Sequence, residues 1–215
     1  APTLATDSLT TNEDIALIHQ LDVINIEQDD LSFEIITESP NGNISIDTTG
    51  EVTYQPNENF NGTDFFVVKV IDQYGGDSEK NITIKVVSIN DAPVVSTNSF
   101  NLAEDSKLNT NIESFDVEGD LLTYVLTAEA SNGTLVFNTE GHFDYQPNEN
   151  YFGSDSFTYS VSDGISSPIN GSVNLTITPV NDTPTLVVEN LMLDEDTSIS
   201  GQADASDIEG DKLAY

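Results

Sequence analysis

The sequence predicts an all-β protein made of tandem seven-stranded Greek-key sandwiches, each of immunoglobulin-like size and joined end to end. Two observations predict this fold. Apolar residues alternate with polar ones along most of the chain, as in strands with one buried face. The whole pattern also returns after 91 residues without a gap. In contrast, no stretch of about ten residues keeps the apolar stripe of a helix.

The repeat is visible in motifs that recur at a fixed offset. The Ala-Pro pair at residues 1–2 returns 91 positions later at 92–93, and as Thr-Pro at 183–184. Residues 55–59 return unchanged as 146–150. We therefore expect three parts: a first repeat over 1–91, a second over 92–182, and the incomplete N-terminal part of a third over 183–215.

The second repeat shows the strands in order. Its alternating runs lie near residues 94–96, 107–112, 124–126, 135–137, 143–145, 157–161 and 173–177. The pair Asn132-Gly133 stands between two of these runs and predicts a hairpin with a type I′ turn. The third part holds only the first strands. Because half a sandwich cannot bury its apolar face, we expect this third part to be poorly ordered unless the preceding repeat or a metal holds it. We also expect the chain to be a monomeric segment of a longer protein.

Composition excludes several classes of function. The chain has 38 acidic residues, five lysines and no arginine, for a formal net charge of −33. Such a surface repels phosphate backbones and anionic lipid, so we expect neither nucleic-acid binding nor membrane insertion, and no apolar run is long enough for a membrane span. The charge favours cations, either divalent ions at specific sites or the salt atmosphere of a haloadapted surface. No cysteine is available for a disulfide.

Acidic residues gather in three places of each repeat. Glu-Asp pairs recur at 13–14, 104–105 and 195–196, and an Asp-x-Glu-Gly-Asp loop occurs at 116–120 and again at 207–211. The third place is the Asn-Asp pair of each linker, together with Asp163 after a late strand. Calcium prefers six to eight hard oxygens from carboxylates, carbonyls and asparagine side chains. These clusters therefore predict calcium binding.

The motifs resemble those of a known family. They are Asn-Asp-Ala-Pro at 90–93, Asp-x-Glu-Gly-Asp-x-Leu-x-Tyr at 116–124 and Phe-x-Tyr-x-Val-x-Asp-Gly at 157–164. They resemble cadherin repeats, and more closely the bacterial cadherin-like tandem repeats of large secreted (RTX-type) adhesins, whose Tyr-x-Pro-x-x-x-Phe-x-Gly-x-Asp-x-Phe stretch is similar to residues 54–66 and 145–157. Tyr151 replaces the central Phe in the second copy.

The resemblance implies calcium between consecutive repeats. At the first junction the implied ligands are Glu13, Asn90, Asp91, Asp116, Glu118 and Asp163. At the second junction they are Glu104, Asn181, Asp182, Asp207 and Glu209. Asp120 and Asp211 join them on chemistry alone. Near the place of a further acidic pair in cadherins, but in a different local motif, lie Glu58, Asp64, Glu149 and Asp155.

The first repeat departs from this pattern. Its loop at residues 25–29 begins with asparagine instead of aspartate and has glutamine in place of glycine. That loop would face a domain upstream of the chain. We expect a site there to be weak or empty.

The functional expectation is an extracellular, cell-surface adhesin or stalk, rigidified by Ca²⁺, that serves bacterial adhesion or biofilm. We expect no enzyme activity, because the chain has no nucleophile elbow, phosphate loop or zinc spacing, and because His19 and His142 are not at equivalent positions. Two alternatives stay open. The repeats could bind surface glycans or homophilic partners themselves, with Tyr74 as the one candidate aromatic, or they could be the accessory region of a secreted enzyme.

Overall fold

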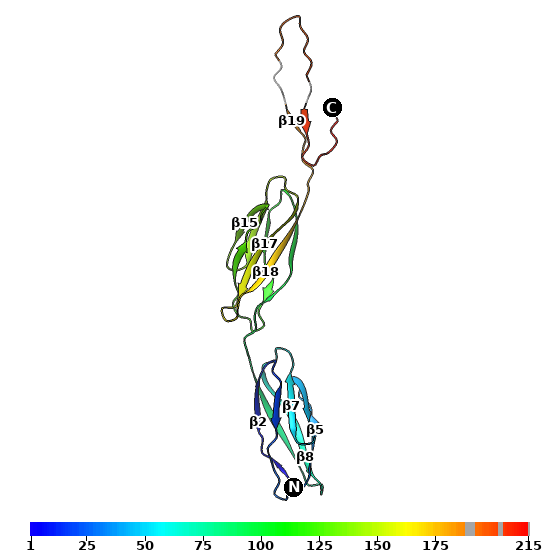
Figure 1. Cartoon of the computed structure of the whole chain (residues 1–215), viewed down its shortest axis with the longest axis vertical. Helices are drawn as coiled ribbons and strands as arrows, with labels where there is room; N and C mark the ends of the chain where they lie inside the picture. Colours follow the sequence, from blue (N-terminus) through cyan, green and yellow to red (C-terminus); the bar gives the residue numbers. More distant parts are fainter. Residues whose placement is uncertain (188–191, 202–203, 215) are drawn as a thin grey trace. The chain divides into compact units, whose positions relative to one another are not determined.

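The computed structural model describes residues 1–187, 192–201 and 204–214, and every regular element in them is a β-strand (Figure 1). The chain divides into two compact units, Ala1–Asn90 and Asp91–Tyr215. The prediction of an all-β fold is confirmed.

The first unit is a sandwich of two sheets. Its strands are β1 (Thr3–Leu4), β2 (Ser8–Asn12), β3 (Leu17–Gln20), β4 (Val23–Ile24), β5 (Leu31–Thr37), β6 (Gly42–Ile46), β7 (Glu51–Pro56), β8 (Gly62–Asp72) and β9 (Asp77–Val87). One sheet has the order β2-β9-β8-β5 and the other β3-β7-β6, while β1 and β4 form a short ribbon. β2 runs parallel to β9, and every other pairing is antiparallel. The two sheets together hold the seven strands expected of the sandwich.

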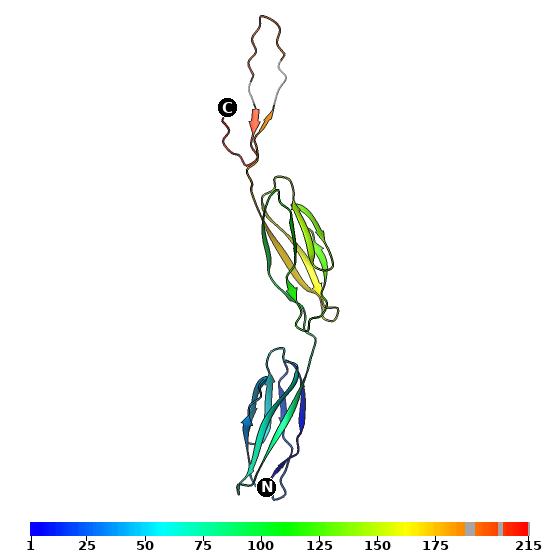
Figure 2. The same cartoon turned by 180° about the vertical axis from the view of Figure 1, so that it is seen from behind.

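The second unit repeats this topology. Its strands are β10 (Val94–Val95), β11 (Asn98–Ala103), β12 (Leu108–Asn111), β13 (Ser114–Phe115), β14 (Thr123–Ala128), β15 (Gly133–Phe137), β16 (His142–Pro147), β17 (Gly153–Ser162) and β18 (Ile169–Thr178). The sheets have the orders β11-β18-β17-β14 and β12-β16-β15, with β10 and β13 as the ribbon. Figure 2 shows the other side of each sandwich, where the same long strands can be followed.

Period-two burial builds a core between the sheets. Along β8 the side chains of Phe66, Val68 and Val70 are fully buried, and the residues between them face outward or are half-buried. In the second unit Phe143 and Phe157 meet edge to face, with ring centroids 4.9 Å apart. Such apolar burial is the main favourable term in folding. Each unit therefore has a core of its own.

One buried carboxylate in each core is part of the scaffold. Asp64 Oδ2 accepts hydrogen bonds from the Tyr54 hydroxyl at 2.8 Å, from the Asn41 backbone N–H and from the Ser39 hydroxyl, and Asp64 Oδ1 accepts from the Phe65 N–H at 2.8 Å. Its counterpart Asp155 accepts from the Tyr145 hydroxyl at 2.8 Å and from the backbone N–H groups of Ser131, Asn132 and Ser156. Because protein donors take both oxygens of each carboxylate, we assign these two aspartates to the sandwich and not to a metal.

The predicted hairpin at Asn132-Gly133 is wrong. β14 and β15, which flank this pair, lie in different sheets, and neither residue has a positive φ. Gly133 instead begins β15 at a point where a Cβ atom would lie only 2.5 Å from the ring of Tyr145. The glycine is needed for this close approach, a use that the dipeptide pattern does not distinguish from a turn.

In the described residues after the second sandwich there are two short strands. β19 (Thr185–Val187) pairs antiparallel with β20 (Asp204–Ser206). None of the described side chains from residue 183 to residue 214 is buried. This agrees with the expectation that the first strands of a sandwich lack a core of their own. Tyr215, the counterpart of Tyr124, lies outside the described residues.

Candidate metal centre

Strand register places Glu104 next to the second linker, the segment around Asn181-Asp182 that follows β18. β11 and β18 are parallel partners, with Ala103 opposite Thr178, so the residues that follow both strands emerge together. The Glu104 backbone N–H donates to the Thr178 carbonyl at 3.0 Å, and the Val180 N–H donates to Glu104 Oε1 at 2.6 Å. The Glu104 side chain is only 1% exposed. Its carboxylate is therefore fixed against the linker backbone.

The acidic loop at residues 207–211 presents Glu209 to the same linker. The Asp211 N–H donates to Asp207 Oδ1 at 3.0 Å, and Gly210 takes the left-handed conformation that closes the turn, with φ of 79°. The Asp182 N–H then donates to Glu209 Oε2 at 3.1 Å. The linker thus lies between two glutamates, one on either side of it in the sequence.

Three carboxylates converge in this way. Glu104, Asp182 and Glu209 each have an oxygen within 4.8 Å of an oxygen of the other two. Glu104 Oε2, Asp182 Oδ2 and Glu209 Oε1 are buried and have no hydrogen-bond partner. Among the residues that the structure describes, no lysine or histidine forms an ion pair with any of the three. Buried carboxylate oxygens without donors are costly unless a cation binds them.

The pKa of Asp182 reflects its partial burial and the negative charges close to it. Partial burial, together with the negative charges of Asp105, Glu104, Asp207 and Glu149, raises the pKa of the Asp182 carboxyl above its ordinary value. Glu149 and Asp207 also line a cleft with Asp182. In the sequence, Asp105 is recognisable only as a member of a recurring Glu-Asp pair, and Glu149 only as lying near the place of a further acidic pair. Their positions depend on how two loops meet, which the spacing of the motifs does not specify.

The donor set fits a hard divalent cation. Three buried carboxylate oxygens meet there, and no lysine or histidine in the described part of the chain pairs with their carboxylates. Calcium prefers oxygen ligands of this type in flexible geometry. Glu104, Asp182 and Glu209 would hold such an ion, with Glu149, Asp105 and Asp207 at its edge.

The other acidic loop of the second unit has the same construction. The Asp91 N–H donates to Glu118 Oε2 at 3.1 Å, as the Asp182 N–H does to Glu209. Asp116 Oδ1 accepts from the Glu118 and Asp120 N–H groups, and Asp116 Oδ2 and Glu118 Oε1 are buried without a partner. The motif therefore folds alike in both of its copies.

Some predicted site residues have other contacts. Asp163 Oδ1 caps its own turn by accepting from the N–H groups of Ile165 and Ser166. The Asn181 side chain donates to the Asp182 carbonyl at 2.9 Å. Asp120 and Asp211 take part in their loops through their backbone N–H groups. These four assignments stay predictions.

The first unit holds its own Glu-Asp pair differently. The Ile89 N–H donates to Glu13 Oε1 at 2.6 Å, and the Asn61 side chain donates to Glu13 Oε2 at 3.3 Å. Glu13 is 2% exposed. Asn90, the other predicted ligand in this unit, directly follows Ile89 in the linker. Both oxygens of Glu13 therefore have protein donors.

The departing loop at residues 25–29 keeps the left-handed turn of the acidic loops but has two acidic residues where they have three. Gln28 adopts the left-handed conformation, with φ of 56°, where the other copies have glycine. The Asn25 side chain donates to the Asp29 carbonyl at 2.8 Å. A neutral amide thus closes a turn that a carboxylate closes elsewhere.

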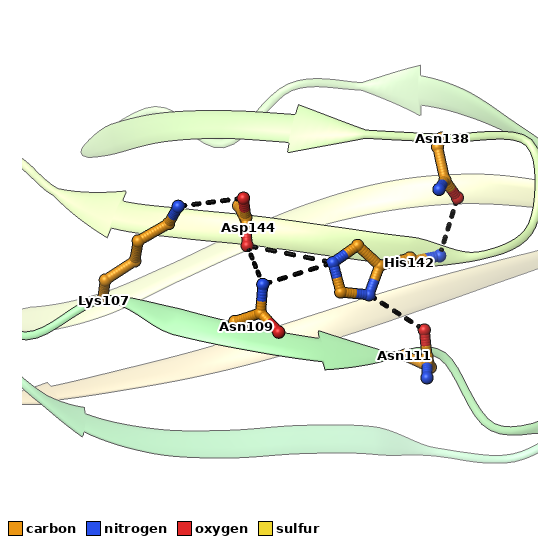
Figure 3. A network of polar contacts seen from close by, with 6 residues as sticks. All are labelled: Lys107, Asn109, Asn111, Asn138, His142 and Asp144. Atoms are coloured by element: carbon orange, nitrogen blue, oxygen red, sulfur yellow. Dashed lines mark hydrogen bonds and ion pairs between the residues drawn. The ribbon is translucent and has the colours of Figure 1, made fainter.

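A polar network on β12 and β16 includes His142 (Figure 3). Lys107 pairs with Asp144 at 2.9 Å, Asn109 donates to Asp144, and His142 Nδ1 lies 3.0 Å from Asn111 Oδ1. These side chains face one another across neighbouring strands, so they stabilise the sheet as cross-strand pairs. The sequence marks His142 only as a histidine without an equivalent in the first repeat, and its contacts with Asn111 and its neighbours depend on strand pairing. Tyr74, the candidate glycan contact, is 80% exposed in the turn after β8.

The fold and the acidic junctions define a class of protein, namely tandem β-sandwich modules with carboxylate clusters next to their linkers. The profile of the bacterial cadherin-like domain matches the chain twice, over residues 1–88 and 90–179. The chain therefore belongs to the bacterial cadherin-like domain family, and the resemblance predicted from its motifs is confirmed. Domains of this kind are typically non-enzymatic adhesion modules, and they generally bind calcium.

Solved structures agree on the fold. The human CDH23 EC21-23 structure covers 96% of this chain and 80% of its own, at 17% identity and a TM-score of 0.58. Human Protocadherin-24 EC1-2 covers 84% of this chain and 99% of its own, at 15% identity and a TM-score of 0.55. The human Desmocollin-1 ectodomain covers 91% of this chain at 14% identity and a TM-score of 0.53, and the match spans 44% of that ectodomain. No curated protein sequence matches the chain.

Cadherin-like ectodomains are extracellular. Among the described residues, no helix has the length and apolar character needed to cross a bilayer.

Proposed function

We propose that the chain is a calcium-rigidified segment of a bacterial extracellular adhesin or stalk, of the type found in large secreted RTX-type adhesins, that serves cell-surface adhesion or biofilm. The convergence of Glu104, Asp182 and Glu209, with a buried unpartnered oxygen on each, is the observation that carries the proposal. The ligands proposed for the first junction occupy equivalent positions, with Asp120 as a further candidate. They are Glu13, Asn90, Asp91, Asp116, Glu118 and Asp163.

Calcium would stiffen the second linker by binding the glutamates before and after it in the sequence. The linker backbone is hydrogen-bonded to Glu104 before it and to Glu209 after it. Without a cation these carboxylates repel one another, as the raised pKa of Asp182 reports. A bound ion would replace that repulsion by shared coordination and stiffen the linker. Binding only to the folded junction would also stabilise it, by about 2.7 kcal/mol at about a hundredfold excess of calcium over Kd.

Small-angle X-ray scattering of the full chain tests this proposal. We expect the maximum dimension to increase and the profile to stiffen when EGTA is replaced by millimolar calcium, with no such change in magnesium. Profiles that respond only to bulk salt would instead favour the haloadapted surface, and the proposed sites would then be wrong. A glycan array read with and without calcium separates rigidification from direct glycan binding.

A further inference from the structure

We propose that the residue at position 61 of the first repeat, and its counterpart at 152 of the second, sets the calcium affinity of the neighbouring glutamate. This inference rests on the proposed function and extends it to regulation, since it makes two junctions of similar sequence bind calcium at different concentrations. Position 61 is asparagine and position 152 is phenylalanine, within segments that are otherwise closely matched.

In the first repeat the asparagine already satisfies the glutamate. Glu13 Oε1 accepts from the Ile89 N–H at 2.6 Å, and Glu13 Oε2 accepts from Asn61 Nδ2 at 3.3 Å. The same loop also holds the next acid, because the Asn59 N–H donates to Asp14 Oδ1 at 3.1 Å. The loop after β7 therefore supplies donors to both members of the Glu-Asp pair.

In the second repeat the corresponding donor is missing. Glu104 Oε1 accepts from the Val180 N–H at the same distance of 2.6 Å, but Glu104 Oε2 has no hydrogen-bond partner although the residue is 1% exposed. Phe152 has no polar side-chain atom and is 47% exposed at the surface. One buried carboxylate oxygen is thus left for another partner.

The two glutamates would pay different costs on binding calcium. At Glu13 the ion must displace a donor that already offsets the burial of the carboxylate, whereas at Glu104 the ion supplies the first compensation that Oε2 receives. The asparagine therefore acts as an internal substitute for the cation. We expect the substitution at this position to change affinity about tenfold, which corresponds to about 1.4 kcal/mol.

A reciprocal swap in the full chain tests the inference, with calcium binding followed by isothermal titration calorimetry. Asn61→Phe is expected to tighten the site that contains Glu13 about tenfold, and Phe152→Asn to weaken the site that contains Glu104 by a similar factor. Glu13→Gln and Glu104→Gln assign each binding step to its site. Asn43→Phe, on the exposed side of β6, is the matched control and should leave both affinities unchanged. Melting curves in EGTA confirm that each variant is folded.

The outcomes separate the two proposals. If the wild-type chain binds no calcium, the proposed function fails and this inference fails with it. If the wild type binds calcium but neither swap alters the affinity, only the inference is overturned. If Asn61→Phe weakens the first site, Asn61 is itself a ligand through its carbonyl oxygen, which also overturns the inference.

Discussion

Glu13 and Glu104 are 91 residues apart, follow equivalent strands, and accept the same hydrogen bond from the following linker. They differ in their second oxygen, which has an amide donor in the first repeat and none in the second. The pair Asp64 and Asp155 differs less, because in both repeats the core tyrosine and backbone N–H groups bind the carboxylate. Repetition in sequence therefore does not separate the two roles: Asp64 and Asp155 are satisfied by protein donors, whereas Glu104 keeps a buried oxygen that no donor reaches and is a candidate ligand.

The largest expected effect comes from the carboxylates that the repeats share. Asp155→Ala leaves the buried Tyr145 hydroxyl and the partly buried N–H groups of Ser131 and Asn132 without an acceptor, so we expect the second sandwich to lose on the order of 3 kcal/mol of unfolding free energy. Chemical denaturation measures it. Glu140→Ala, in an exposed turn of the same sandwich, is the control and should change stability by less than about 0.5 kcal/mol. Equal losses in both variants would show that Asp155 has no special role.

The next largest effect is expected on calcium affinity when Glu104, the glutamate with an unpartnered oxygen, is replaced. Glu104→Gln keeps a carbonyl oxygen for the Val180 N–H but removes one charge from the cluster, so we expect calcium affinity to fall at least about tenfold, or about 1.4 kcal/mol, while stability in EGTA does not decrease. Calcium titration followed by calorimetry measures the first quantity and thermal melting in EGTA the second. An unchanged affinity would remove Glu104 from the site.

A smaller effect is expected from acid. Burial alone would raise the pKa of Asp155, but hydrogen bonds from Ser131, Tyr145, Asn132 and Ser156 outweigh it and hold the pKa below its ordinary value. Because the folded pKa is the lower one, this carboxylate stabilises the sandwich at pH values above the ordinary carboxyl range, and the stabilisation is lost as the pH falls through the folded value. The unfolding free energy, measured by chemical denaturation at several pH values across that acid range, should therefore fall more steeply with falling pH for the wild type than for Asp155→Asn. The same pH dependence in both proteins would contradict the stabilising role of the Asp155 carboxylate.

The smallest effect is expected in the network that only the second repeat has. Lys107 and Asp144 pair on the surface, where the first repeat has Ala16 and Thr53 at the equivalent positions. Exposed ion pairs contribute little and are screened by salt, so Lys107→Gln should lower the melting temperature only slightly, and less at high salt. A large loss would indicate that the network is part of the core scaffold.

The sequence was sufficient to predict the sandwiches because the period-two alternation and the repeat at an offset of 91 residues are both visible without knowledge of tertiary contacts. The hairpin at Asn132-Gly133 was predicted wrongly because glycine can serve either a turn or a close contact, here with the ring of Tyr145, and only the tertiary fold decides between them. Glu104, Asp182 and Glu209 are all ligands that the resemblance implies, and the structure brings them together. Asp105 was predicted only as a member of an acidic pair, and Glu149 only as lying near a further pair, because their approach to Asp182 depends on loop packing.

The most direct test of the calcium account is a crystal structure of the full chain grown in calcium, with the ion identified by its anomalous scattering. The account predicts an ion about 2.3–2.6 Å from oxygens of Glu104, Asp182 and Glu209, with Glu104 Oε2 among its ligands. A structure obtained in calcium in which Glu104 Oε2 binds water or a protein donor, and no ion lies among the three carboxylates, would contradict it.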